Sequence, residues 1–295
     1  MVENNNTKVG VIGLGSMGSA LADALLNQGS NLLVWNRTSQ KCARFVDAGA
    51  TVAASAADAA LESDVLIVCL TDHAASMEIL NSRLVANHMA GKVLILLSTM
   101  SGDESLITAE WADEQNIAYL DGSILGYPDN VRNQDCMIVY SGPREAFESC
   151  SAVLNALGGM PRLVGEKAGI SPLFDKAIYS VSYAHWIGLF HGAAMCEAVG
   201  APLDVYIEAT TKYWDWSTQD AIFLDMIKKR DYSLVDATVE LHSAAYSHVL
   251  PLSEKLGINT KLPKTISDCF QSALNQGYKD SELPALFEVL GKGDS

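Results

Sequence analysis

The sequence predicts a two-domain α/β protein, in which a domain built on a doubly wound parallel sheet is followed by an all-helical domain. Three observations predict this fold. Short apolar runs alternate with helical segments through the first half of the chain, a glycine-rich turn follows the first run, and strand signals cease near Gly165. Such alternation is typical of βαβ units. We expect the α/β domain over residues 1–165, and a long interdomain helix and a helical domain over residues 166–295.

The expected strands are short apolar runs without polar alternation, as in strands that are buried on both faces of a parallel sheet. They cover residues 8–12, 32–35, 65–70, 93–97, 117–121 and 137–140. Helix-like segments separate them, at residues 40–48, 56–62, 76–89 and 104–115, after a first alanine- and leucine-rich helix that ends near residue 28. The order of these segments predicts a sheet with helices on both faces.

The second half of the chain begins with one unusually long apolar helix. Residues 170–199 contain no strong helix breaker after Pro172, which suits the first turn of a helix. One small domain is unable to bury so long an apolar helix unaided, so this helix predicts packing against a second subunit. The remaining residues, 203–290, predict several amphipathic helices.

Composition and charge exclude several classes of function. The net charge of −15 disfavours nucleic acids and anionic membrane surfaces as partners. The six cysteines lie far apart without a CxxC pair, and the six histidines have no metal-ligand spacing, so we expect no disulfide and no metal. The amino-terminal residues lack the apolar stretch of a secretory signal, which predicts a cytoplasmic protein. No HExxH, P-loop or GxSxG motif is present.

A GxGxxG motif directly follows the first expected strand and opens the first helix. Its residues are Gly13, Leu14, Gly15, Ser16, Met17 and Gly18. In this position the first glycine permits a tight turn, the second lets the backbone approach a diphosphate, and the third allows helix and strand to pack closely. A glycine-rich turn without a ligand is the alternative. The motif in this context predicts a Rossmann dinucleotide-binding domain.

The end of the second expected strand indicates NADPH rather than NADH. NAD enzymes place Asp or Glu here to bind the ribose 2′-hydroxyl. This chain instead has Asn36, Arg37 and Thr38, followed by Lys41, and the next carboxylate is that of Asp47. A guanidinium can bind a 2′-phosphate through charge-assisted hydrogen bonds and can stack on adenine. Further cofactor contacts are expected at the ends of later strands, from Leu70, Thr71, Ser98 and Thr99.

With these motifs the whole chain resembles the imine reductases and reductive aminases of the β-hydroxyacid dehydrogenase superfamily. The resemblance is carried by GLGSMG at residues 13–18, WNRT at 35–38, the segment 121–128 and the segment 165–175. It implies an NADPH-dependent enzyme with a helical carboxyl-terminal domain like that of 6-phosphogluconate dehydrogenase. It also implies a homodimer that exchanges these helical domains, with each active site between the Rossmann domain of one subunit and the helices of the other.

Asp175 is the position that distinguishes reactions within this superfamily. Hydroxyacid dehydrogenases that resemble this chain carry lysine there, usually with asparagine four residues later, whereas this chain has Asp175 and Tyr179. Reduction of C=O develops negative charge on oxygen, which a cation stabilises. Reduction of an iminium ion starts from a cation, which a carboxylate stabilises, and a charge pair near 4 Å is worth about 4 kcal/mol at an effective dielectric of roughly 20. The alternative role for Asp175 is that of an ordinary carboxylate near a helix amino terminus.

The resemblance also implies a proton donor and a substrate pocket. Tyr183 lies two helical turns after Asp175 and matches a tyrosine of fungal reductive aminases; a core aromatic residue is the alternative. Thr99 stands where reductive aminases often have asparagine, which argues against amine-assisted condensation. The expected pocket residues are Ser123, Leu125, Tyr127, Tyr179, Trp214 and His242, although a surface role for His242 and a core role for Trp214 are the alternatives.

Together these observations predict NADPH-dependent reduction of cyclic imines or iminium ions to amines, with Asp175 stabilising the cation or delivering the proton. Reductive amination is a possible extension of this activity. A carbonyl reductase of the hydroxyacid dehydrogenase type is the second hypothesis, and a non-catalytic NADPH-binding protein is the third.

Overall fold

The computed structural model describes residues 7–212, 216–233 and 236–291. The chain forms two compact units, residues 1–180 and 181–295, which we describe separately. The division falls within the long helix α10 (Ile170–Ala198), not near residue 165, where the strand signals of the sequence end. In the described part of the chain, no helix is both long enough and apolar enough to cross a membrane.

The first unit is built on an eight-stranded sheet in the order β3-β2-β1-β4-β5-β6-β7-β8. The strands are β1 (Lys8–Ile12), β2 (Asn31–Trp35), β3 (Thr51–Val52), β4 (Val65–Val68), β5 (Val93–Leu96), β6 (Ala118–Leu125), β7 (Cys136–Ser141) and β8 (Gly159–Gly165). All pairs are parallel except β6 with β7. The chain runs outward from β1 to β3 and returns to β4 on the other side of β1. Ligands of such sheets bind at this switch point, beyond the carboxyl ends of the strands.

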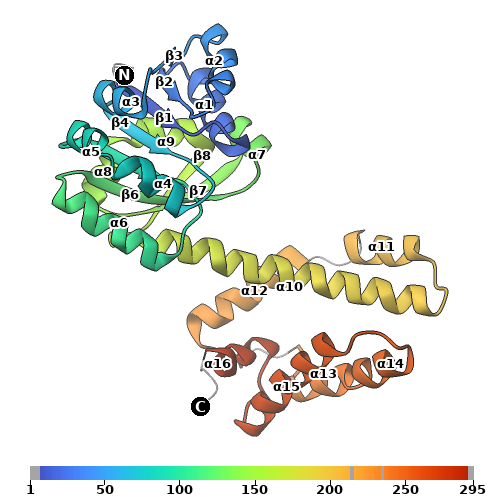
Figure 1. Cartoon of the computed structure of the whole chain (residues 1–295). Coiled ribbons are helices and arrows are strands. Elements are labelled where there is room, and N and C mark those ends of the chain that lie inside the picture. The colour runs from blue at the N-terminus through green and yellow to red at the C-terminus, as the bar shows by residue number, and fades with distance from the viewer. Residues whose placement is uncertain (1–6, 213–215, 234–235, 292–295) are drawn as a thin grey trace. The chain divides into compact units, whose positions relative to one another are not determined.

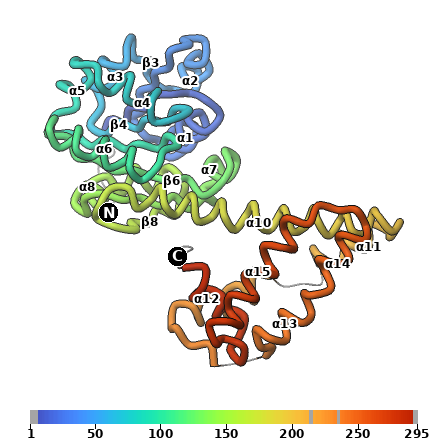
Figure 2. The backbone as a smooth tube through the Cα atoms, turned by 60° about the horizontal axis from the view of Figure 1, so that its bottom comes forward, coloured from blue at the N-terminus to red at the C-terminus, as the bar shows by residue number. Residues whose placement is uncertain are grey.

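Helices cover both faces of this sheet (Figures 1 and 2). They are α1 (Ser16–Asn27), α2 (Ala43–Asp47), α3 (Ala56–Glu62), α4 (His73–Leu80), α5 (Arg83–Met89), α6 (Gly102–Glu114), α7 (Pro128–Arg132), α8 (Arg144–Ser149) and α9 (Ser151–Gly158). Alternate side chains of β4 enter opposite cores: Ile67 packs in one buried cluster and Leu66 in the other. This burial on both faces explains why the strands appear in the sequence as continuous apolar runs.

The predicted fold class is confirmed, and its differences from prediction are local. The segment 76–89, expected as one helix, is divided into α4 and α5 because Asn81 caps the first helix and Ser82 has the extended backbone (ψ 123°) that precedes the second. Strands β3 and β8 were not predicted. The first is only two residues long, and the second contains Pro161 and Arg162, which interrupt the apolar pattern.

The second unit contains the remainder of α10 and a set of shorter helices. These are α11 (Leu203–Lys212), α12 (Trp216–Lys229), α13 (Val239–Tyr246), α14 (Val249–Lys255), α15 (Lys261–Asn275) and α16 (Phe287–Leu290). Its buried core is small and is centred on Val239, Phe270, Ala273 and Ala285. Large apolar side chains of α10 remain exposed, among them Val181 at 68% and Phe190 at 69%.

Candidate active site

The glycine-rich segment 13–18 connects β1 to α1, and its three glycines have different surroundings. Gly13 has a φ of +98°, and a Cβ there would lie 2.3 Å from the carbonyl oxygen of Cys69. At Gly18 a Cβ would lie 2.0 Å from the carbonyl oxygen of Gly13. At Gly15, by contrast, a Cβ would meet nothing within 4 Å. The first and third glycines are therefore required by packing, and the second borders open space.

Asn36 connects this turn to the end of β2. Its Oδ1 accepts a hydrogen bond from the backbone N–H of Leu14 at 2.9 Å, and its Nδ2 donates to the carbonyl oxygen of Thr38 at 3.0 Å. The amide thus uses an acceptor and a donor to join two loops that are far apart in sequence. A carboxylate at this position would keep the first interaction and lose the second, because it has no donor.

A cavity of about 560 Å³ lies along the carboxyl ends of β1, β2 and β4. Most of the residues predicted to bind the cofactor line it: Gly13, Gly15, Ser16, Met17, Gly18, Asn36, Arg37, Thr38, Lys41, Leu70 and Thr71. Leu14 does not, because its side chain is buried in the core. Arg37 and Lys41 bring positive charge to the end of the cavity near β2.

Four other residues of this wall were not predicted from the sequence, namely Cys69, Ala75, Glu78 and Ile79, and Trp35 was included only as the first residue of the WNRT motif. Ala75, Glu78 and Ile79 lie on α4, which follows β4 after a four-residue loop. Asp72 caps this helix by accepting the N–H of Ala75 at 2.8 Å. The signal for this helix in the sequence was an aspartate shortly after a buried strand, because Asp is a common cap at the amino terminus of a helix.

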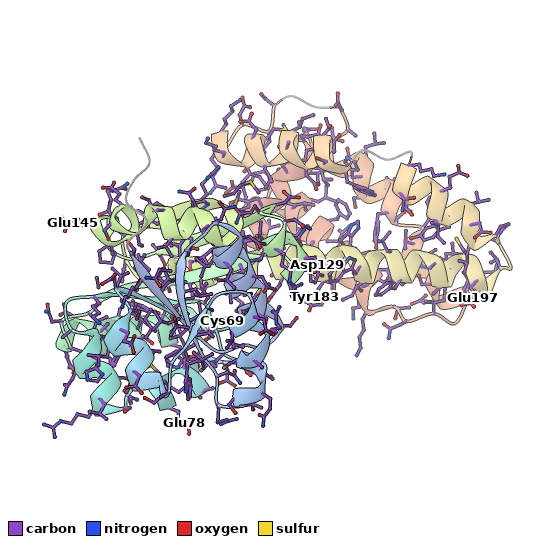
Figure 3. All side chains as sticks on the ribbon, turned by 90° about the horizontal axis from the view of Figure 1, so that it is seen from above. Cys69, Glu78, Asp129, Glu145, Tyr183 and Glu197 are labelled. Atoms are coloured by element: carbon purple, nitrogen blue, oxygen red, sulfur yellow. The ribbon has the colours of Figure 1, made fainter. Side chains whose placement is uncertain are left out.

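A smaller cavity of about 200 Å³ adjoins the first, because Met17, Cys69 and Leu70 line both. Figure 3 labels Cys69 among the side chains at the end of β4. Burial raises the pKa of the Cys69 thiol to about 12, so this shared wall holds a neutral thiol. The remaining wall is mixed: Leu97, Met100 and Ile124 are its apolar side chains, and the others are glycines and polar residues.

The smaller cavity brings together residues that were predicted for two different roles. Asp175 and Tyr179 of α10 face Ser98, Thr99 and Ser123 across it. Two hydrogen bonds fix the Ser98 side chain. Its Oγ accepts a hydrogen bond from the backbone N–H of Leu70 at 2.8 Å, and it lies 2.8 Å from Ser76 Oγ. An acidic side chain therefore shares an otherwise neutral cavity with hydroxyl groups and apolar side chains.

Asp175 has one close charged neighbour. Its Oδ2 lies 2.6 Å from Nζ of Lys176, and the same ammonium lies 5.3 Å from the centre of the Tyr179 ring. The carboxylate is only 15% exposed, whereas the Lys176 side chain is 44% exposed. A carboxylate and an aromatic face that hold an ammonium between them form an environment suited to a cation.

Other predicted residues lie elsewhere. Leu125 and Tyr127 are outside the wall of the smaller cavity, and Tyr127 is 70% exposed at the start of α7.

Tyr183, labelled on α10 in Figure 3, belongs to the second unit and packs edge-on against Trp186, with ring centres 5.5 Å apart. His242 is paired with Glu282, with Nε2 3.8 Å from Oε1. Trp214 lies outside the described residues.

Asp121 differs most from its expected place. It begins the segment that was expected to line the substrate pocket, and Gly122, Ser123, Ile124 and Gly126 of that segment do line the smaller cavity. Asp121 itself is fully buried behind this wall, where it accepts hydrogen bonds from four groups on three segments of the chain. No group of three or more metal-binding side chains occurs among the residues that the structure describes.

Comparison with known proteins agrees with this arrangement. The sequence model for the NAD binding domain of 6-phosphogluconate dehydrogenase matches residues 8–165. That for the C-terminal domain of NADPH-dependent reductive aminase-like proteins matches residues 167–292.

Individual relatives cover nearly the whole chain. An imine reductase from Myxococcus stipitatus, solved in complex with NADP+, is 30% identical, with a TM-score of 0.85 over 96% of this chain and 99% of that chain. A reductive aminase from Aspergillus terreus, solved with NADPH and ethyl-5-oxohexanoate, is 27% identical, with a TM-score of 0.84 over 96% and 99% of the two chains. An NADPH-dependent reductive aminase of Aspergillus oryzae is 24% identical over 290 residues, or 97% of each chain.

Proposed function

The chain belongs to the imine reductases of the β-hydroxyacid dehydrogenase superfamily, and we propose that it reduces cyclic imines or iminium ions to amines with NADPH. The observation that carries this proposal is the position of Asp175. Its carboxylate lies in a cavity that shares a wall with the cofactor cavity, and no Lys, Arg or His is among the described residues that line this smaller cavity. The ammonium of Lys176 binds the carboxylate without lining the cavity.

The charge of this site favours C=N over C=O reduction. Bound NADPH supplies a hydride to the substrate carbon. An iminium ion carries a positive charge that the Asp175 carboxylate stabilises, whereas a carbonyl develops negative charge that the same carboxylate disfavours. We propose that Asp175, which lines the smaller cavity, also holds or delivers a proton at the substrate nitrogen. Tyr183 of the second unit is the alternative donor.

The residues of the larger cavity fit NADPH. The open space at Gly15 allows the backbone to approach the diphosphate, whose charge is stabilised by the amino terminus of α1. Arg37 and Lys41 would bind the 2′-phosphate, and Thr38 would add a hydroxyl. Asn36 keeps the two loops in register rather than binding the ribose as an acidic residue does in NAD enzymes.

We propose that the enzyme works as a homodimer with exchanged helical domains. The second unit buries few apolar residues, and exposed apolar side chains extend along α10. A second copy of the chain would cover them and would bring helices of its own second unit to the smaller cavity. Tyr183, Trp214 and His242 are candidates for that contribution.

The function is tested by assaying a panel of cyclic imines, ketones and hydroxyacids through NADPH absorbance. We expect turnover of the imines. Asp175→Asn is nearly isosteric and removes the charge, so imine reduction should fall by roughly 10²–10⁴ with little change in NADPH affinity. Asp175→Lys should abolish imine turnover. Turnover of ketones alone, or an Asp175→Asn rate within about twofold of the wild type, would contradict the proposal.

A further inference from the structure

A buried carboxylate behind the substrate cavity fastens the beginning of α10 to the sheet. We propose that Asp121, acting through Ser141 and Ser171, is the positioning residue that fixes Asp175 against the bound substrate. The proposal rests on the proposed function only in taking Asp175 as the group that acts on the substrate. It assigns to Asp121 a role in the rate of the reaction, although Asp121 does not line the cavity.

The Asp121 side chain is fully buried and accepts four hydrogen bonds. Its Oδ1 accepts from the hydroxyls of Ser141 and Ser171, the latter at 2.6 Å. Its Oδ2 accepts from the hydroxyl of Ser105 at 2.5 Å and from the backbone N–H of Gly169 at 2.6 Å. Every partner is a donor, so the acceptor capacity of a carboxylate is fully used. Ser105, Ser141 and Ser171 are themselves fully buried.

This cluster satisfies the backbone at the amino terminus of α10. The first N–H groups of a helix have no partner within the helix. Here the N–H of Gly169 bonds to Asp121, and those of Ile170 and Ser171 bond to Ser141 Oγ at 3.1 and 2.9 Å. A negative charge at this end of a helix is also favourable for the helix dipole. The first turn of α10 is thus attached to β6 and β7 by both backbone and side-chain contacts.

The first turn of α10, which this cluster attaches to the sheet, directly precedes the turns that carry Asp175 and Tyr179. Asp175 follows Ser171 by four residues and Tyr179 follows it by eight, so the three lie along one side of α10. Ser171 is buried against Asp121, whereas Asp175 and Tyr179 line the smaller cavity one and two turns later. A misplacement of about 1 Å in a reacting group can cost about 10²-fold in rate. Loosening the first turn should therefore reduce turnover before it affects cofactor binding.

Ser105 provides a matched control. It lies on α6, is as fully buried as Ser171, and donates to the same carboxylate. Its other contact is with the Tyr119 hydroxyl at 3.2 Å, and it forms no hydrogen bond with α10. Replacing either serine by alanine removes one hydroxyl from Asp121, but only Ser171→Ala loosens the helix that carries Asp175.

The experiment compares Ser171→Ala with Ser105→Ala in the full-length enzyme, measuring melting temperature, NADPH affinity, kcat and KM for a cyclic imine. We expect similar losses in melting temperature and NADPH affinities within about twofold of the wild type. The kcat of Ser171→Ala should fall about tenfold or more, whereas that of Ser105→Ala should stay within about twofold. Ser171→Thr, which keeps the hydroxyl, should restore most of the rate. Equal effects of the two alanine variants on kcat would overturn the proposal.

The same pair of variants is then made in an Asp175→Asn background. If Ser171 acts by positioning Asp175, Ser171→Ala should lower the remaining rate by no more than about twofold there. A full tenfold loss in that background would overturn the proposal. Asp175→Asn with nearly wild-type activity would instead refute the assigned role of Asp175. If Ser171→Ala failed to fold, Ser171→Cys and Ser105→Cys, which retain a weak donor of similar size, would provide the same comparison.

Discussion

Arg37 lies at the end of β2 as an exposed side chain in the wall of the larger cavity. Only NADPH carries the phosphate that this guanidinium can bind, so Arg37→Ala should weaken NADPH far more than NADH. Loss of a charge-assisted contact costs about 1.5–3 kcal/mol, or roughly ten- to a hundredfold in affinity. Titration of both cofactors into the variant measures the effect. Arg83→Ala, which removes an exposed arginine at the start of α5, is the control. Equal weakening of NADPH and NADH would show that Arg37 does not bind the phosphate.

The ammonium of Lys176 lies outside the wall of the smaller cavity and contacts Asp175 and Tyr179, so it competes with a cationic substrate for the Asp175 carboxylate. Neighbouring residues of a helix do not face each other, so Lys176 reaches Asp175 only because its side chain is long and flexible. An ion pair with so exposed a partner is worth about 1 kcal/mol or less. A substrate iminium ion can therefore displace it.

Lys176→Met removes the ammonium that competes with the substrate for the Asp175 carboxylate. We expect the KM for a cyclic iminium substrate to fall about two- to fivefold, with kcat nearly unchanged. Lys229→Met, which breaks a comparable exposed ion pair with Asp225 in the second unit, should change neither constant. Steady-state kinetics at saturating NADPH provides the measurement. A large fall in kcat for Lys176→Met would instead identify Lys176 as a participant in proton transfer.

Individual residues were predictable from the sequence where a motif fixes them. The glycines of residues 13–18 and the Asn36–Arg37 pair occupy defined places in a βαβ unit, and they line the larger cavity as expected. Asp121 was not predictable in the same way. An acidic residue at a strand end has the appearance of a site residue, and its partners Ser105, Ser141 and Ser171 are spread over three segments that only the folded sheet brings together.

At the scale of elements, Gly15 in the turn between β1 and α1 and Gly18 in the first turn of α1 serve different purposes. A side chain at Gly18 would collide with the backbone of Gly13, whereas one at Gly15 would enter open space. Gly18→Ala should therefore destabilise the protein by several kcal/mol, since rigid backbone surrounds the added methyl group. Gly15→Ala should leave the melting temperature nearly unchanged without cofactor.

The binding of NADPH should be affected in the opposite order, more by Gly15→Ala than by Gly18→Ala. In Gly15→Ala the added methyl group should block the approach of the diphosphate, so NADPH affinity should fall at least tenfold and the stabilisation by NADPH should be lost. Thermal unfolding with and without NADPH measures both quantities for each variant. A Gly15→Ala protein that is as unstable as Gly18→Ala without cofactor would contradict the assignment of open space at Gly15.

Long elements with strong apolar patterns were predictable, and short interruptions were not. The helix expected at residues 170–199 is α10 (Ile170–Ala198), because an apolar run of this length without a breaker permits no other structure. The break between α4 and α5 depends on the single polar pair Asn81 and Ser82. Strand β3 exists only because β2 provides hydrogen-bonding partners for two residues, which is a tertiary effect.

At the scale of the whole molecule, α10 belongs to both halves of the chain. Its first eleven residues lie in the unit that contains the sheet, and the rest lie in the helical unit. The family comparisons divide the chain earlier, between residues 165 and 167. The helix therefore carries Asp175 in one unit and Tyr183 in the other.

The exposed apolar side chains of α10 lead to the final prediction, which concerns assembly. Phe190 is 69% exposed and Ile187 is 52% exposed, and their burial by a second copy of the chain would favour association by roughly 25 cal/mol for each Å² of apolar surface. Light scattering should therefore give about twice the chain mass of 31.6 kDa. Phe190→Glu places a charge in this interface, so it should shift the protein toward monomers. Leu84→Glu, at an equally apolar position of α5 that is 59% exposed, should leave the mass unchanged.

The same variant separates cofactor binding from catalysis. The larger cavity lies entirely within the first unit, so a Phe190→Glu monomer should still bind NADPH. Imine reduction should be lost, because the helices that a second copy contributes would be missing, and the specific activity of the wild-type enzyme should fall on dilution below the dissociation constant of the dimer. A wild-type protein that scatters as a monomer and has full activity at every concentration would contradict the dimer.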